Sequence, residues 1–292
     1  MVRYLKKNPW FALMRPHQWI KNLLLFVPLI AAHQFFNWPL AWPCFLGFVC
    51  MSLTASAIYA LNDVVDASAD RQHPQKSCRP VACGQISPRS ALRASLFCIL
   101  LAGAFLFLLP PNFLFFWIAY LLAVSLYIFG LKRFPGVDVI FLTIFYLLRI
   151  YMGGAATEIT PSWWVMGFAT CSFLSLALMK RSAEVQQNPY KKMEGRPYGR
   201  KSLFTLNTLG ILFALLAGLS LVIYAGSDQA DLLYQNPVYI YAAAPLVWAW
   251  FARAWGRTLR SKMEIDPVDF ALRDFSGYLV VLGGILLGWL AV

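Results

Sequence analysis

The 292-residue chain is 60% hydrophobic, 16% aromatic and only 13% charged, and its mean hydropathy is +0.60. This composition excludes an ordinary soluble globular protein and indicates a chain that crosses a lipid bilayer several times. The net charge of +12 would suit nucleic acid. However, the basic residues lie between apolar segments with no separate soluble domain to hold them, so we expect no nucleic-acid partner. Anionic lipid head groups and phosphorylated substrates are better candidates.

Nine segments approach or reach the length of about 20 apolar residues that a transmembrane helix needs. In chain order they cover residues 20–36, 40–61, 90–109, 112–131, 138–157, 162–181, 204–225, 237–255 and 271–292. The first is short and contains Pro28, so its limits are the least well defined. We therefore predict an all-α polytopic membrane protein with nine transmembrane helices in a single domain over residues 1–292, of which residues 1–19 precede the first span.

The basic residues set the orientation of these spans. When alternate loops are assigned to the same side, every Lys and Arg except Arg149 falls on the side of the N-terminus. The positive-inside rule makes that side cytoplasmic. We therefore predict a multi-pass protein of the inner (plasma) membrane, with its N-terminus and its active site facing the cytoplasm.

An acidic motif extends the second span on this side. Asp63, Asp66 and Asp70 are spaced i, i+3 and i+7, so on a helix they lie within roughly 60° of one another, with Asn62 at the edge. Three carboxylates this close repel one another unless a cation is present, and oxygen ligands suit Mg²⁺ better than zinc. We predict that Asp63, Asp66 and Asp70 bind Mg²⁺ with help from Asn62. The alternative is a solvated helix end that balances nearby basic charge.

A basic string follows the acidic motif directly. It contains Arg71, His73, Lys76 and Arg79. Cations of this kind bind phosphate oxygens well, so metal and cations together predict a site for a diphosphate. Lys76 and Arg79 also fit ordinary positive-inside charges, and His73 also fits a local structural role beside Pro74.

Other charged residues lie within or at the ends of the spans. Arg149 lies inside the fifth span, three turns beyond Asp138, where an ionisable side chain is costly and by default functional. It would pair with an acidic side chain or bind a phosphate. The remaining basic residues could instead anchor the helix ends by snorkelling. Our candidates for binding substrate phosphates here are Lys21, Lys132, Arg149, Lys180 and Arg181.

Two motifs carry a family resemblance. Residues Asn62 to Pro80 read N-D-x-x-D-x-x-x-D-R-x-H-P-x-K-x-x-R-P, and Arg15 to Asn22 read R-P-x-Q-W-x-K-N. Together they resemble the UbiA superfamily of intramembrane transferases. This resemblance implies a UbiA-type bundle of nine helices, with a magnesium-dependent active site at the cytoplasmic side.

Within the superfamily, the chain is most similar to the decaprenyl-phosphate phosphoribosyltransferase branch. The similarity lies in D-R-x-H-P-x-K-x-x-R-P at Asp70 to Pro80, L-R-x-x-x-G-G-A-A at Leu148 to Ala156, and K-R-x-x-E at Lys180 to Glu184. It extends from Arg15 to about Leu203. Aromatic prenyltransferases carry a second aspartate-rich motif after the sixth span, whereas this chain offers Glu184 and Glu194 among basic residues. Basic groups there suit a monophosphate that needs no second metal.

The resemblance thus implies transfer of 5-phosphoribose from phosphoribosyl diphosphate (PRPP) to a polyprenyl phosphate. The products would be diphosphate and polyprenyl-phosphoryl-5-phosphoribose, a precursor of lipid-linked arabinofuranose donors in cell-envelope glycan biosynthesis. Asp63, Asp66 and Asp70 would be the catalytic residues. Prenyl transfer to an aromatic acceptor is the main alternative, and a non-enzymatic transporter is less favoured because the charges gather at one face. The expected partners are PRPP, polyprenyl phosphate and the lipid bilayer, and the apolar surfaces leave a homo-oligomer open.

Overall fold

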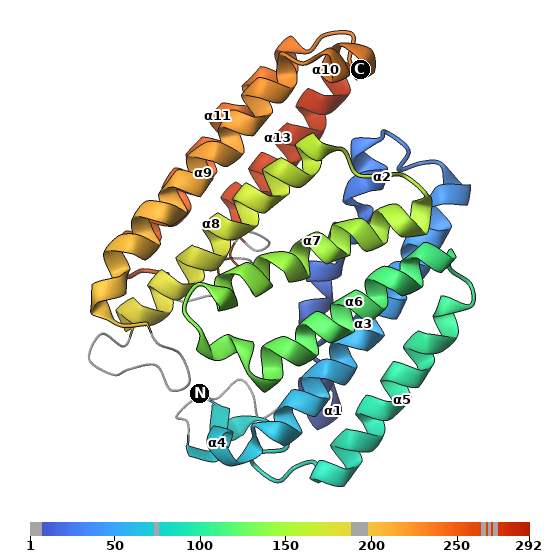
Figure 1. Ribbon diagram of the computed structural model, residues 1–292, viewed down its shortest axis with the longest axis vertical. Coiled ribbons are helices and arrows are strands. Elements are labelled where there is room, and N and C mark those ends of the chain that lie inside the picture. The colour runs from blue at the N-terminus through green and yellow to red at the C-terminus, as the bar shows by residue number, and fades with distance from the viewer. Residues whose placement is uncertain (1–7, 73–75, 188–197, 264–266, 268–269, 271–273) are drawn as a thin grey trace. The chain divides into compact units, whose positions relative to one another are not determined.

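The computed structural model describes residues 8–72, 76–187, 198–263, 267, 270 and 274–292 (Figure 1). Every regular element in these residues is helical, which confirms the all-α prediction. The α-helices are α1 (Pro9–Met14), α2 (Val27–Ala31), α3 (Trp38–Val65), α4 (Ala67–Gln72), α5 (Pro88–Leu106), α6 (Pro111–Phe129), α7 (Val137–Thr157), α8 (Trp163–Gln187), α9 (Leu203–Ala225), α10 (Asp228–Leu233), α11 (Val238–Leu259) and α13 (Phe275–Ala291). Short 3₁₀ helices are η1 (Pro16–Phe26), η2 (Lys76–Cys78), η3 (Leu131–Arg133) and η4 (Arg200–Ser202).

Six of the described helices are long and apolar enough to cross a membrane, and they are α3, α5, α6, α7, α8 and α9. The prediction of nine spans is therefore not confirmed. The first predicted span, 20–36, forms η1 followed by the short helix α2, which has a proline in its first turn. The eighth lies in α11, which contains Pro245 and has arginines in its last turns, and which is not among the six helices that are long and apolar enough to cross a membrane. The ninth lies in α13, which is apolar but has only 17 residues.

The chain divides into two compact units. Unit 1 comprises Met1–Ala119 and Leu148–Thr160, and unit 2 comprises Tyr120–Leu147 and Pro161–Val292. Helices α6 and α7 contribute residues to both. That all 292 residues form one domain stays a prediction.

Helix α3 is the centre of unit 1. It packs against α1, η1 and α5 (Figure 1), and its buried side includes many small residues that allow close approach of neighbouring helices. Helix α7 also approaches the N-terminal segment closely, because a Cβ atom at Gly153 would lie 1.9 Å from the carbonyl oxygen of Leu25 in η1. The N-terminal segment of unit 1 therefore packs against both α3 and α7.

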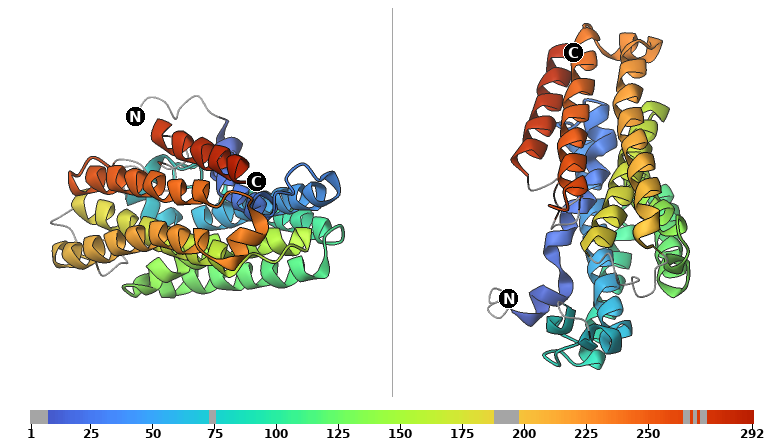
Figure 2. Two further views of the ribbon diagram at one scale, coloured as in Figure 1. Left: turned by 90° about the horizontal axis from the view of Figure 1, so that it is seen from above. Right: turned by 90° about the vertical axis from the view of Figure 1, so that its left-hand side faces the viewer.

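In unit 2, α8, α9, α11 and α13 run side by side (Figures 1 and 2). Two glycines of α9 make room for indole rings of α11. A Cβ atom at Gly210 would lie 2.1 Å from Trp255, and one at Gly218 would lie 2.0 Å from Trp248. The buried indole of Trp255 also donates its N–H to Ser175 of α8 at 3.0 Å. Small residues thus position large aromatic ones in this bundle.

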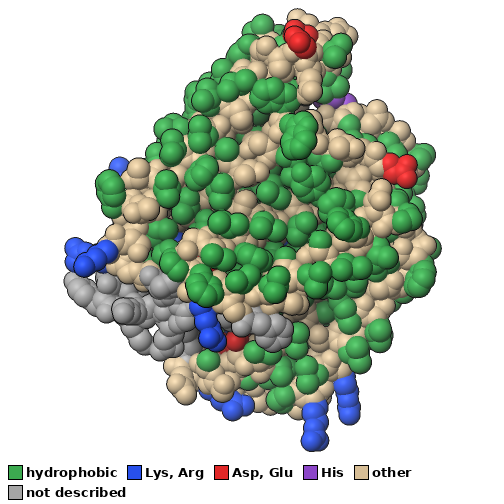
Figure 3. Space-filling model, in the orientation of Figure 1, with side chains coloured by type: hydrophobic (Ala, Val, Ile, Leu, Met, Phe, Trp, Pro, Cys, Tyr) green, Lys and Arg blue, Asp and Glu red, His purple; other side chains and the backbone are tan. Residues whose placement is uncertain are grey.

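The surface supports membrane insertion. Figure 3 shows hydrophobic side chains over most of the visible face and few charged ones. Large apolar side chains such as Phe97, Leu100 and Phe115 are exposed on α5 and α6. Monomeric soluble proteins rarely expose continuous apolar surface of this extent, so these faces suit contact with lipid.

Candidate active site

The acidic motif lies where α3 ends and α4 begins. Asn62 and Asp63 belong to the last turn of α3, Asp66 caps that helix, and Asp70 lies in α4. The helix assignment breaks at Asp66. Even so, the backbone N–H of Asp66 donates to Asn62 and that of Asp70 donates to Asp66, at 2.9 and 2.8 Å. The helical spacing predicted for the three carboxylates is therefore retained across the break.

Two arginines pair with these carboxylates. The Nη2 atom of Arg15 lies 2.5 Å from Oδ1 of Asp63. Nη1 of Arg79 lies 2.6 Å from Oδ2 of Asp70 and 3.5 Å from Oδ1 of Asp63. Asp63 is only 1% exposed, and its Oδ2 atom has no hydrogen-bond partner among the described residues. One oxygen of this buried carboxylate is thus engaged by arginine, and the other is available.

The N-terminal segment is attached to α3 by four side-chain contacts, which we call the polar ladder. Its members on the N-terminal segment have helical spacing, and so do their partners on α3. The pairs are Arg15 with Asp63, Gln18 with Tyr59 (3.4 Å), Trp19 with Ser56 (2.9 Å) and Asn22 with Ser52 (3.1 Å). The polar ladder gives a structural reason for most of the R-P-x-Q-W-x-K-N motif. Sequence reasoning did not assign roles to Arg15 or Asn22, although the two matching helical spacings were a usable signal.

Arg149 joins the polar ladder from α7. Its side chain is buried, and its Nε donates to Oδ1 of Asn22 at 2.9 Å. Asn22 therefore accepts from Arg149 with its oxygen and donates to Ser52 with its nitrogen. The amide thus meets part of the hydrogen-bonding demand of an arginine placed among apolar residues.

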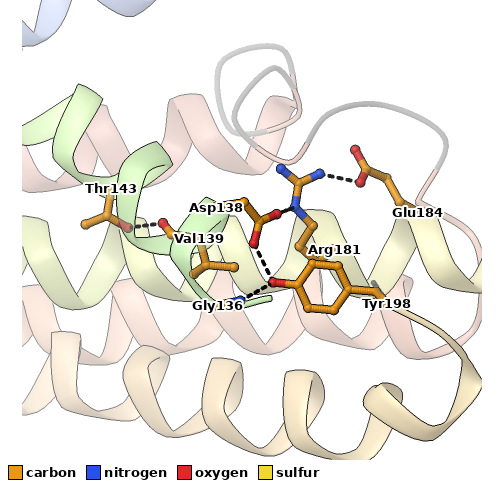
Figure 4. A network of polar contacts seen from close by, with 7 residues as sticks. All are labelled: Gly136, Asp138, Val139, Thr143, Arg181, Glu184 and Tyr198. Atoms are coloured by element: carbon orange, nitrogen blue, oxygen red, sulfur yellow. Dashed lines mark hydrogen bonds and ion pairs between the residues drawn. The ribbon is translucent and has the colours of Figure 1, made fainter. Parts of the chain in front are cut away.

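A second polar cluster lies in unit 2 (Figure 4). Arg181 is fully buried, and its Nε lies 2.5 Å from Oδ2 of Asp138. Its Nη1 pairs with Glu184. The hydroxyl of Tyr198 donates to Asp138 and accepts the backbone N–H of Gly136. Burial, together with the hydrogen bond to Asp138, raises the pKa of Tyr198 to about 12. Sequence reasoning missed Tyr198 because one tyrosine among 13 carries no positional signal.

A sequence model of the UbiA prenyltransferase family matches residues 23–275. The chain belongs to this family. The polar ladder of this UbiA-family protein begins at Arg15, just before the matched region.

Individual relatives fall into two groups by coverage. Protein y4nM of Sinorhizobium fredii is 32% identical over 93% of this chain. This chain spans only about half of the length of y4nM, 53%. Nodulation protein NoeC of Azorhizobium caulinodans is 30% identical over 92% of this chain and 88% of its own. Decaprenyl-phosphate phosphoribosyltransferase of Mycobacterium tuberculosis is 34% identical over 59% of this chain and 58% of its own.

Among solved structures, a UbiA homolog from Archaeoglobus fulgidus bound to DMAPP and Mg²⁺ superposes with a TM-score of 0.66. The two chains share 16% identity over 97% of this chain and 99% of that one. A structure of a UbiA homolog from the same organism bound to Cd²⁺ superposes with a TM-score of 0.64. These likenesses show that the UbiA-family protein has a UbiA-type fold.

The other predicted site residues of the UbiA-family protein are more dispersed. Arg71 is exposed and donates to the carbonyl of Ala82 at 3.2 Å, and Lys76 is exposed in η2. Lys21 of η1 and Lys180 of α8 are half-buried. His73, the side chain of Lys132 and Glu194 lie outside the described residues. The structure thus brings together Asp63, Asp70 and Arg79 in unit 1, and Arg181 with two carboxylates in unit 2.

The residues at the acidic motif suit a hard divalent cation. The described residues contain no preformed group of three His, Cys, Asp or Glu side chains arranged around a metal. They do offer the unpartnered Oδ2 of Asp63, and the half-buried carboxylate of Asp66 makes no hydrogen bond or ion pair in the described part of the chain. Mg²⁺ typically takes one or two carboxylates and completes its shell with water and phosphate. These two carboxylates match that requirement.

Proposed function

We propose that this UbiA-family protein transfers 5-phosphoribose from PRPP to a polyprenyl phosphate. In this reaction the bond from C1 to the diphosphate oxygen breaks and a bond from C1 to an oxygen of the lipid phosphate forms. Diphosphate is released with polyprenyl-phosphoryl-5-phosphoribose. The proposal is supported by the similarity to a decaprenyl-phosphate phosphoribosyltransferase and by the contacts of Arg181 and Glu184.

In our proposal, Asp63, Asp66 and Asp70 hold Mg²⁺ with help from Asn62. When bound, Mg²⁺ would neutralise the diphosphate and so assist its departure. Arg71, His73, Lys76 and Arg79 would bind the phosphate oxygens of PRPP. The pairing of Arg79 with both Asp63 and Asp70 supports this assignment, because it places a guanidinium directly beside the proposed metal ligands.

The lipid phosphate needs cations but no general base, since it is already ionised near neutral pH. Our candidates for binding the phosphate groups of either substrate are Lys21, Lys132, Arg149, Lys180 and Arg181. Of these, Arg181 is held between Asp138 and Glu184 and retains Nη2 as a nitrogen without a hydrogen-bond partner among the described residues. The isoprenoid chain would lie in the bilayer against the apolar helices.

One observation favours this function over transfer of a prenyl group to an aromatic acceptor. Glu184 lies in the region where aromatic prenyltransferases carry a second aspartate motif, and it is paired with Arg181. Asp138, the other carboxylate of this cluster, is paired with Arg181 as well. Both carboxylates contact the same buried guanidinium, so a cationic side chain already lies in this cluster. We propose that the basic residues of this region bind a monophosphate in place of a second metal ion.

The distribution of basic residues supports an inner-membrane protein whose active site faces the cytoplasm. PRPP is a charged, water-soluble donor, whereas polyprenyl phosphate is confined to the membrane. A site at the cytoplasmic surface gives access to both. The lipid product would then serve as a precursor of arabinofuranose donors for an envelope glycan.

The decisive experiment incubates the purified full chain with ribose-labelled PRPP, Mg²⁺ and a polyprenyl phosphate, and measures label in the organic phase. We expect labelled lipid with the wild-type chain and none with Asp66→Asn. Asp231→Asn is the matched control, because Asp231 is exposed on α10 and distant in sequence from either cluster. The control should behave as wild type.

Two results would contradict the proposal. In the first, no labelled lipid forms while the same preparation consumes a prenyl diphosphate with an aromatic acid, which would indicate prenyl transfer. In the second, Asp66→Asn retains full activity, which would remove Asp66 from the metal site.

A further inference from the structure

The contacts of Arg15 point to a function beyond attachment of the N-terminal segment. Its guanidinium lies on Oδ1 of Asp63 and also over the ring of Tyr59, with Cζ 4.8 Å from the ring centroid. Its backbone has φ of 50°, the left-handed conformation with which Arg15 caps the C-terminal end of α1.

The charges around Asp63 are almost balanced. Asp63, Asp66 and Asp70 contribute three negative charges, and Arg15 and Arg79 contribute two positive ones. These five side chains therefore leave one net negative charge. The affinity of a carboxylate site for a divalent cation rises with its net negative charge. A free dication should consequently bind weakly here, even though Oδ2 of Asp63 and the carboxylate of Asp66 are available.

A dication that arrives with a diphosphate meets a different balance. The diphosphate adds the negative charge that the five side chains lack for tight binding of a dication. Its oxygens also offer Arg15 and Arg79 a new partner. In the substrate-bound state Arg15 would pair with a phosphate oxygen in place of Oδ1 of Asp63. Guanidinium groups pair with phosphate as readily as with carboxylate.

We propose that Arg15 is a diphosphate-binding residue that acts as an internal counter-ion of Asp63 until substrate arrives. Cation and diphosphate then bind together, and neither binds tightly alone. This inference takes from the proposed function only that the donor substrate carries a diphosphate. It does not depend on which group is attached to that diphosphate.

The test is equilibrium dialysis of the detergent-solubilised full chain against radiolabelled Mn²⁺, used in place of Mg²⁺, with and without labelled inorganic diphosphate. Dialysis counts only protein-bound label, since the complex of Mn²⁺ with diphosphate is equally present on both sides. For the wild-type chain we expect diphosphate to strengthen Mn²⁺ binding by about tenfold or more. If Mn²⁺ binds equally tightly without diphosphate, the proposal is wrong, and no variant is needed for that conclusion.

Substitution of Arg15 gives effects of opposite sign. Arg15→Gln should strengthen binding of Mn²⁺ alone by about tenfold, because a positive charge beside the site is lost. The same substitution should weaken binding of diphosphate by about tenfold, because a guanidinium that pairs with phosphate is lost. Arg15→Lys, which keeps the charge, should bind Mn²⁺ alone as wild type does. Arg89→Gln is the matched control, because Arg89 is exposed at the start of α5. It should change neither affinity.

The alternative is that Arg15 only orients Asp63. In that case Arg15→Gln would weaken Mn²⁺ binding in the absence of diphosphate, and the proposal would be overturned. No change in either affinity would overturn it as well. The dialysis experiment uses inorganic diphosphate, so its result stays valid if the PRPP assay yields no labelled lipid. In the same way, a negative dialysis result would not contradict transfer of phosphoribose from PRPP.

Discussion

The pair formed by Asp138 and Arg181 should be a major contributor to the stability of unit 2. Both side chains are fully buried, and the same carboxylate accepts the hydroxyl of Tyr198. Asp138→Ala would leave the guanidinium with Glu184 alone and would also remove the acceptor of the tyrosine hydroxyl. Removing one member of a buried ion pair costs about 3–5 kcal/mol. Because Glu184 remains, we expect a loss near the lower value, about 3 kcal/mol.

A loss of this size should be measurable as a change in Tm. For a chain of this size class, about 3 kcal/mol corresponds to a decrease of about 6–12 °C. The assay is thermal unfolding of the full chain in detergent, followed by the fluorescence of its 11 tryptophans. Asp231→Ala is the control, since an exposed position should change stability by no more than about 0.5 kcal/mol.

A double-mutant cycle tests the cause of the loss. Asp138→Ala with Arg181→Met removes both charges, so no buried charge is left without its partner. The double variant should therefore lose less than the sum of the single losses, by about 2 kcal/mol or more. Additivity within about 0.5 kcal/mol would refute the reasoning, as would an unchanged Tm for Asp138→Ala.

Three further predictions use the same unfolding assay. Gly153→Ala should destabilise by about 1–3 kcal/mol, because the new Cβ would lie 1.9 Å from the backbone oxygen of Leu25. Gly167→Ala, with nothing within 4 Å of the new Cβ, should instead stabilise helix α8 by about 0.5–1 kcal/mol. A higher Tm for Gly153→Ala would contradict the first prediction, and a lower Tm for Gly167→Ala would contradict the second. The pKa of Tyr198 is raised to about 12 in the folded chain. The stabilisation that the Tyr198 hydroxyl gives to the folded state should therefore be fully present below pH of about 10, the pKa of an unfolded tyrosine, and should be lost as the pH rises toward the folded-state pKa of Tyr198. The Tm difference between wild type and Tyr198→Phe should therefore be constant up to pH of about 10 and narrow above it. A difference that stays constant up to pH of about 11 would contradict this.

Much of the fold could be predicted because six spans are continuous apolar stretches. The predicted span 40–61, for example, corresponds to α3, which runs from Trp38 to Val65. The first span was predicted from hydropathy alone. Apolar content does not distinguish an α-helix from the 3₁₀ segment η1, whose geometry depends on the contacts of its polar side chains with α3.

The candidate site could be predicted only where its residues are neighbours in sequence. Asp63, Asp66 and Asp70 share a spacing that indicates a common face, and that face is preserved. Arg15 and Asp63 are separated by 48 positions, and Asn22 and Arg149 by 127. Such contacts arise from helix packing; the helical spacing of Arg15, Gln18, Trp19 and Asn22 shows that they share a face but does not identify their partners.

The polar ladder also bears on how the protein can be shortened. The family match begins at residue 23, directly after Asn22. A chain trimmed at that boundary would keep every predicted metal ligand yet lack Arg15 and Asn22. Asp63 would lose its 2.5 Å contact with Arg15, and the buried Arg149 would lose its contact with Asn22. A shortened chain that keeps these contacts must therefore begin before Arg15.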